Sequence, residues 1–160
     1  MTIKTGDKVP EGRFNVMNED GPGSLSTKDL FGGKKVVIFS VPGAFTPTCS
    51  RQHLPGFVDK ADEIKAKGVD TVACTAVNDV FVMDAWGKSA NAGDKVLMLA
   101  DGNGEYAKAL GLEMDGTGFG LGMRGARFAL VVEDGTVTKT FIEEAGSFEV
   151  SSAENVLANL

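Results

Sequence analysis

The residue in this sequence best suited to nucleophilic chemistry is Cys49, which follows the tripeptide Thr46-Pro47-Thr48. Proline is favoured at the first position of a helix, and threonine can cap a helix from the position before it. Cys49 is therefore expected in the first helical turn, where unpaired backbone N–H groups and the helix dipole favour a negative charge. This placement favours the thiolate, which is the reactive form of cysteine. The alternative is a small, buried, inert cysteine that happens to begin a helix.

The residue three positions before Cys49 indicates which reaction the thiolate would perform. A dithiol oxidoreductase would carry a Cys-x-x-Cys pair here, but this position holds Thr46, so no disulfide can close within the motif. A threonine hydroxyl can instead form a hydrogen bond with the thiolate or with an incoming oxygen atom. The pattern favours attack on the O–O bond of a peroxide, which converts the thiolate to a sulfenic acid.

Two further residues have side chains that could take part in thiol chemistry. Cys74 lies in an apolar segment 25 residues after Cys49, and a buried structural cysteine is the expected interpretation. His53 lies four residues after Cys49 and could share its helical face. A Cys–His pair would indicate a thiol hydrolase, whereas the plainer interpretation is that His53 holds the helix or a subunit contact.

The elements that position these residues follow from the pattern of apolar residues and turn signals. Strands are expected over 35–41, 70–77 and 95–100, and a β-hairpin over 127–132 and 136–142. Helices are expected over 47–67 with a bend at Pro55, from about Asp79 after a capping Asn78, over 105–112, and from Ser151 or Ser152 onwards. The glycine-rich segment 113–125 is expected to be a loop beside the site.

The alternation of strands and helices predicts right-handed crossovers and a parallel core to the sheet. The expected fold is α/β, a thioredoxin-like three-layer α/β/α arrangement with a central mixed sheet and an N-terminal extension. Residues 1–160 are expected to form a single domain, since neither a repeat nor a second domain is visible in the sequence.

Composition and net charge disfavour several classes of protein. The chain has 160 residues, 42% of them hydrophobic, and a net charge of -6, which disfavours nucleic acid and anionic membranes as partners. No apolar run approaches the roughly 20 residues of a membrane span, and the N-terminus lacks a secretory signal, so a cytoplasmic location is expected. Two cysteines and one histidine cannot build the usual zinc site, and no phosphate-binding or dinucleotide fingerprint follows a strand, so neither a metal nor a cofactor is expected.

Three segments carry a resemblance to a known family. They are PGAFTPTCS at 42–50, HLPGF at 53–57 and ARFALVVEDG at 126–135. Together they resemble the signature of the peroxiredoxin-5 and plant type II peroxiredoxins, and the resemblance extends from about Lys4 to the C-terminus. It implies a thiol-dependent peroxidase that reduces hydrogen peroxide and alkyl hydroperoxides.

The resemblance also implies roles for single residues. Cys49 would be the peroxidatic cysteine, Pro42 would shield it, and Thr46 would form a hydrogen bond with the peroxide. Arg127 would lie beside the thiolate and polarise the peroxide as charge develops on the departing oxygen. Arg124 is close in sequence, but Arg127 fits the motif.

The partners implied by the resemblance are a reductant and a second copy of the chain. Some relatives carry a resolving cysteine in the segment that corresponds to 148–152, where this chain has Ser151 and Ser152. An external thiol, either glutathione with glutaredoxin or thioredoxin, is therefore expected to regenerate Cys49. The family's homodimer contact would involve segments that contain Phe45, Phe81, Trp86, Phe119, Leu121 and Met123. A redox-sensor or chaperone role at the same Cys49 stays open as an addition.

Overall fold

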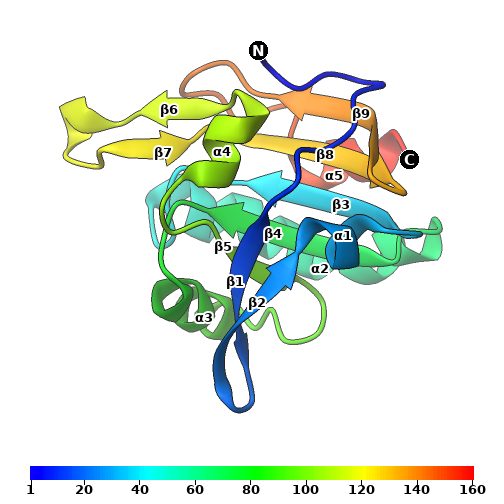
Figure 1. The fold of residues 1–160 in the computed structure, drawn as a ribbon, viewed down its shortest axis with the longest axis horizontal. Helices are drawn as coiled ribbons and strands as arrows, with labels where there is room; N and C mark the ends of the chain where they lie inside the picture. The colour runs from blue at the N-terminus through cyan, green and yellow to red at the C-terminus, as the bar shows by residue number, and fades with distance from the viewer.

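The computed structural model describes residues 1–160, in which one large sheet is covered by helices on both faces (Figure 1). The strands are β1 (Arg13–Asn18), β2 (Gly21–Ser26), β3 (Lys35–Ser40), β4 (Thr71–Ala76), β5 (Leu97–Ala100), β6 (Glu113–Asp115), β7 (Met123–Gly125), β8 (Phe128–Glu133) and β9 (Thr136–Ile142). The α-helices are α1 (Thr27–Phe31), α2 (Leu54–Ala66), α3 (Val80–Ser89), α4 (Glu105–Leu110) and α5 (Ala153–Ala158). A π-helical turn (Cys49–His53) precedes α2, and a 3-10 turn (Thr117–Phe119) lies between β6 and β7.

The large sheet has seven strands in the order β2-β1-β5-β4-β3-β8-β9. Strands β3, β4 and β5 are parallel and alternate along the chain with α2 and α3. The outer strands pair antiparallel, so the sheet is mixed, as expected. One register pair matters for the site: Ser40, the last residue of β3, lies opposite Phe128, the first residue of β8.

Alternating side chains of the central strands pack into two apolar cores, one on each face of the sheet. Val37 and Phe39 of β3 pack in the core that α2, α3 and α5 cover. Val36 and Ile38 point to the other face, into the core that α1 and α4 cover. Figure 1 shows α2 and α5 behind the sheet, with α1 and α4 in front of it. The expected three-layer α/β/α fold is confirmed.

Most strands and helices lie where the sequence pattern predicts them, with ends that differ by one or two residues. The N-terminal cap of α3 differs from the expectation. The Asp79 side chain, rather than that of Asn78, caps α3 by accepting a hydrogen bond from Val82 N–H at 2.9 Å. Asn78 Oδ1 instead accepts from Ala44 N–H at 2.9 Å and so ties the loop after β3 to the start of α3.

Two segments contain strands that the sequence pattern did not reveal. Residues 113–125, expected to be a loop, form a small antiparallel hairpin of β6 and β7 that projects from the body (Figure 1). The N-terminal extension forms the β1–β2 hairpin, which joins the edge of the large sheet through β5. Glycine interrupts the apolar pattern in both segments, and β6 and β7 are too short to give the alternation that predicts a strand.

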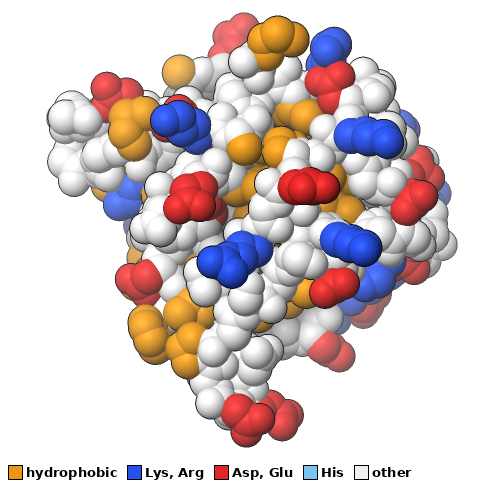
Figure 2. All heavy atoms as spheres, viewed as in Figure 1, with side chains coloured by type: hydrophobic (Ala, Val, Ile, Leu, Met, Phe, Trp, Pro, Cys, Tyr) orange, Lys and Arg blue, Asp and Glu red, His pale blue; other side chains and the backbone are white.

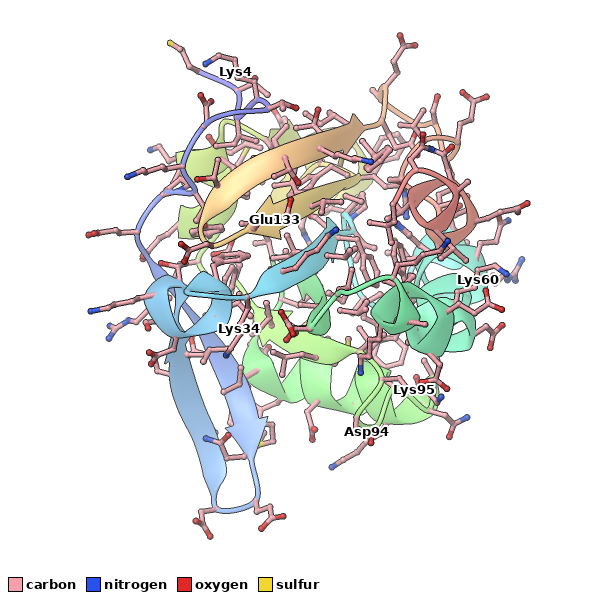
Figure 3. All side chains as sticks on the ribbon, turned by 90° about the vertical axis from the view of Figure 1, so that its right-hand side faces the viewer. Lys4, Lys34, Lys60, Asp94, Lys95 and Glu133 are labelled. Carbon is pink, nitrogen blue, oxygen red and sulfur yellow. The ribbon has the colours of Figure 1, made fainter.

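Charged side chains are spread over the surface with both signs interspersed (Figure 2). In Figure 3, Lys60 and Lys95 lie on the side of the molecule that carries α2. Lys95 Nζ pairs with Asp62 Oδ2 at 3.1 Å, but the Asp62 side chain is 80% exposed, so this pair contributes about 0–1 kcal/mol. No helix of the structure combines the length and apolar composition needed to cross a membrane.

Candidate active site

The segment that leads into Cys49 begins a helix where the sequence predicts it. Pro47 is the first helical residue, and the Thr46 carbonyl accepts from Ser50 N–H at 2.9 Å. The Thr46 hydroxyl donates to the Gly43 carbonyl at 2.7 Å and accepts no hydrogen bond from the backbone of the first turn, so it does not cap this helix, contrary to the expectation. Cys49 therefore lies in the first turn, and its side chain is fully buried.

The helix is irregular over residues 49–53, directly before the expected bend point, Pro55. Residues 49–53 form a π-helical turn in which Leu54 N–H donates to the Cys49 carbonyl. Pro55 has no N–H to donate into a regular α-helical ladder, which accounts for an irregular turn directly before it. Such π turns occur often at functional sites.

Arg127 is the charged residue that lies on the sulfur of Cys49. Its Nη2 donates to Cys49 Sγ at 3.1 Å. Arg127 directly precedes β8, and the register between Ser40 and Phe128 places it beside the end of β3, from which the chain continues toward Cys49. A guanidinium in this position stabilises the thiolate by a charge-assisted hydrogen bond.

His53 contacts Arg127 and forms no hydrogen bond with Cys49. Its Nδ1 lies 2.8 Å from Arg127 Nη1, and its Nε2 lies 3.0 Å from the Ser151 carbonyl. Since a guanidinium is always protonated, Nδ1 must be the acceptor, and Nε2 carries the proton. The histidine therefore orients Arg127, a contact that was not predicted from the sequence, and it has no free lone pair with which to act as a base on Cys49.

The environment keeps His53 neutral. Burial, followed by the charge of Arg127, lowers the pKa of His53 to about 3. Because this pKa lies below the value of about 6.5 for an unfolded histidine, the unfolded state binds the proton more readily between these values. The stability that comes from a neutral His53 is complete above pH 6.5 and is lost as the pH falls toward 3.

This shift gives a measurable pH dependence of folding. Urea unfolding of the wild type between pH 7 and pH 4 should show a loss of unfolding free energy with a histidine contribution of about 1.4 kcal/mol per pH unit. His53→Gln should lack that contribution, because His53 is the only histidine of the chain. Equal slopes for both proteins in this pH window would contradict the prediction.

A turn near the C-terminus completes the surroundings of His53 and Arg127. The ring of Phe148 lies 5.0 Å from the His53 ring and 5.6 Å from the Arg127 guanidinium carbon. Glu143 accepts hydrogen bonds from Ser151 and from Glu149 N–H. Neither Glu143 nor Phe148 was predicted to be a site residue, because neither belongs to the motif that contains Cys49.

Pro42 and Arg124 lie together at the other side of the loop after β3. Arg124 Nη1 donates to the Pro42 carbonyl at 3.3 Å, and Arg124 Nε donates to the Leu121 carbonyl at 2.8 Å. Pro42 and Thr46 are both half-buried in the segment between β3 and Cys49. Of the two candidate arginines, Arg127 contacts the sulfur and Arg124 fixes the loop.

Cys74 is buried in β4, opposite Phe39 of β3, and both cysteines are free thiols. Burial, followed by the nearby Cys49, raises the pKa of Cys74 well above its ordinary value. A thiol that stays protonated is a poor nucleophile. The structure therefore favours the interpretation of Cys74 as a packing residue.

Comparison with known proteins identifies the family to which this site belongs. The Redoxin family model matches residues 4–157. The chain belongs to the Redoxin family. It is 50% identical over 159 residues to peroxiredoxin-2B of Arabidopsis thaliana, with 99% of this chain and 98% of that protein covered. It is also 50% identical over 165 residues to the chloroplastic peroxiredoxin-2E-2 of Oryza sativa subsp. japonica, with 99% of this chain and 73% of that protein covered.

Solved structures agree with this assignment. The reduced Prx3 of Vibrio vulnificus in complex with H2O2 superposes with a TM-score of 0.95 at 50% identity, with 99% of each chain covered. The chain is therefore a peroxiredoxin of the type II and peroxiredoxin-5 class with a thioredoxin-like fold, and it is a thiol-dependent peroxidase. The peroxiredoxin contains no group of three or more His, Cys, Asp or Glu side chains that could hold a metal ion.

Proposed function

We propose that Cys49 is the peroxidatic cysteine of this peroxiredoxin, with Arg127, Thr46 and Pro42 completing the active site. The observation that carries the proposal is the hydrogen bond of 3.1 Å from Arg127 Nη2 to Cys49 Sγ. The Arg127 guanidinium therefore contacts a cysteine that also lies in the first turn of a helix. Both features favour the thiolate.

In the proposed reaction the thiolate of Cys49 attacks one oxygen of a hydroperoxide. An S–O bond forms, the O–O bond breaks, and the departing oxygen takes a proton and leaves as water or an alcohol. The sulfur is oxidised to a sulfenic acid while the peroxide is reduced. Arg127 stabilises the negative charge that develops on the departing oxygen.

Thr46 has a defined part in this proposal. Its hydroxyl hydrogen is committed to the Gly43 carbonyl at 2.7 Å, so its lone pairs are free to accept a hydrogen bond from the peroxide. Pro42 would shield the thiolate from water, and the bond from Arg124 to its carbonyl supports a fixed loop. Because Cys49 has no exposed surface, side chains beside it must move for a peroxide to reach the sulfur.

The proposed reductant is an external thiol, either glutathione with glutaredoxin or thioredoxin. Ser151 and Ser152 occupy the C-terminal segment in which some relatives carry a resolving cysteine. Cys74 is buried in the middle of a paired strand and would need local unfolding to form a disulfide with Cys49. An external thiol would convert the sulfenic acid to a mixed disulfide and water, and a second thiol would then release the thiolate.

Intact mass after one equivalent of hydrogen peroxide tests this proposal. The reduced protein should gain one oxygen at Cys49, and added glutathione should replace that oxygen with a glutathione adduct. Cys49→Ser should show neither change, whereas Cys74→Ala should show both. A loss of two hydrogens that requires both cysteines would make Cys74 the resolving residue and would contradict the proposed cycle.

We also infer that the peroxiredoxin forms a homodimer through an apolar surface beside the site. Phe45, Phe81, Phe119 and Met123 are 51–87% exposed, while Trp86, which was grouped with them from the sequence, is buried. Figure 2 shows hydrophobic side chains gathered over α3, which carries Phe81, and on the projecting β6–β7 hairpin. Phe45 adopts φ of 65°, which costs about 1–3 kcal/mol for such a residue, and this strained backbone holds an exposed phenyl ring.

A charge placed on this surface should separate the dimer. Phe81→Asp is expected to shift the protein from dimer to monomer in analytical ultracentrifugation, because a desolvated carboxylate without a partner is costly at an interface. Asn103→Asp adds the same charge at an exposed position before α4 and should leave the dimer intact. A wild type that sediments as a monomer at micromolar concentration would contradict the proposal.

We further propose that residues 1–160 act as one domain and that the protein is located in the cytoplasm. The two apolar cores share the central strands of one sheet, which supports a single folding unit. Cell fractionation tests the location, and recovery of the protein in an organelle would contradict it.

A further inference from the structure

The turn that follows β9 contains a carboxylate oxygen with an unusual number of donors. Glu143 Oε2 accepts from Glu149 N–H at 2.8 Å, from Ser151 N–H at 2.8 Å and from the Ser151 hydroxyl at 2.7 Å. Hydrogen bonds to an ionised acceptor are roughly twice as strong as neutral ones. One carboxylate oxygen therefore closes the turn from 143 to 151 and fixes the backbone of Ser151.

The backbone of Ser151 in turn supports the His53 tautomer that the contact with Arg127 requires. The Ser151 carbonyl lies 3.0 Å from His53 Nε2 and accepts its proton. With the proton held at Nε2, Nδ1 is left as the acceptor for Arg127 Nη1 at 2.8 Å. A histidine with the opposite tautomer would present N–H to the guanidinium and could not hold it.

Two further contacts connect the same turn with Arg127. Glu143 N–H donates to the Arg127 carbonyl at 3.1 Å. Phe148, in the middle of the turn, packs on both the guanidinium and the His53 ring. The conformation of the turn and the position of Arg127 are therefore set together.

The charge state of Glu143 suits this arrangement. Partial burial by itself raises the pKa of Glu143, but the hydrogen bonds from Ser151 and Glu149 outweigh it, so the net pKa lies below the ordinary value. The carboxylate is thus ionised at neutral pH and accepts all three donors.

We propose that Glu143 is a positioning residue for peroxide reduction at Cys49. Its carboxylate holds the turn whose Ser151 carbonyl keeps His53 in the tautomer that orients Arg127 on the sulfur. This inference rests on the proposed role of Arg127. Glu143 itself contacts neither the sulfur nor the place of the substrate, and it acts through Ser151 and His53.

The first arm of the test is the rate constant for the reaction of reduced protein with hydrogen peroxide. Glu143→Ala should lower it about 10- to 100-fold, because a small misplacement of a catalytic group has effects of that order. Glu143→Gln keeps an acceptor oxygen and should retain the rate within about threefold. Glu144→Ala, a neighbouring exposed glutamate, is the matched control and should react like the wild type.

The second arm of the test measures the tautomer of His53 directly and does not depend on peroxide turnover. His53 is the only histidine, so 15N NMR of protein labelled in its imidazole groups reports this residue alone. The wild type, Glu143→Gln and Glu144→Ala should show Nε2 protonated and Nδ1 unprotonated. Glu143→Ala should show exchange between tautomers, which a general loss of stability in a protein that remains folded would not produce.

The outcomes separate this proposal from the one on which it depends. A wild-type rate or a wild-type tautomer in Glu143→Ala would overturn the role of Glu143, while a slow Arg127→Met variant would leave the proposed function standing. If Arg127→Met reacts as fast as the wild type, the proposed role of Arg127 fails, and this inference fails with it. Should Glu143→Ala not fold, Glu143→Asp, which retracts the carboxylate by one methylene, is expected to react more slowly with a mixed tautomer, and wild-type values of both would overturn the proposal.

Discussion

Cys49→Ser is expected to abolish peroxide reduction and to lower the rate constant with hydrogen peroxide by about 10⁴-fold or more. A serine hydroxyl remains protonated beside Arg127 and is a far weaker nucleophile than a thiolate. The variant should fold, because a serine side chain is smaller than that of cysteine and fits into the same buried position. Stopped-flow measurement of peroxide consumption by reduced protein, without any added thiol, tests this directly.

The matched control for this experiment is Cys74→Ala. Cys74 is equally buried, so the two variants perturb comparable environments, but its thiol stays protonated in the strand. Cys74→Ala should retain the wild-type rate with peroxide and lose some unfolding free energy. A variant of Cys49 that still reduces peroxide at the wild-type rate would contradict the assignment of the nucleophile.

Arg127→Met is expected to lower the same rate constant by about 10²- to 10³-fold, which is the effect of removing one preorganised donor from a site of developing negative charge. Methionine fills a similar volume without a charge or a donor. The loss should appear in the reaction with peroxide and much less in the later reaction with the reducing thiol. Rapid-mixing kinetics of the two half-reactions distinguish these steps.

Two other arginine variants sharpen this prediction. Arg124→Met removes the bond to the Pro42 carbonyl but no contact with the sulfur, so a change of about threefold or less is expected. Arg127→Lys keeps the charge, but a single ammonium cannot reproduce the planar fork that joins Cys49 Sγ and His53 Nδ1, so an intermediate loss is expected. A larger loss in Arg124→Met than in Arg127→Met would contradict the assignment.

The central fold was predictable from the sequence because its strands and helices have strong local signals. Residues 36–39 of β3 are an uninterrupted run of β-branched and aromatic residues, and Gly68 marks the end of the helix before β4. The β6–β7 hairpin could not be predicted, because each strand is three residues long and the pairing supplies the only evidence for it. The β2 strand contains two glycines and a proline and is held in the sheet by its pairing with β1.

The position of Cys49 was determined by the sequence alone, since the four residues from Thr46 to Cys49 are contiguous and a helix start is a local structure. The tertiary structure decided which distant residues surround it. Arg127 reaches the sulfur because the antiparallel register of β3 and β8 brings Phe128 opposite Ser40, and no local pattern records that register. The contact of the Glu143–Ser151 turn with His53 also depends on the tertiary structure: the hydrogen bond between His53 Nε2 and the Ser151 carbonyl joins residues 98 positions apart, and only folding brings them within reach of one another.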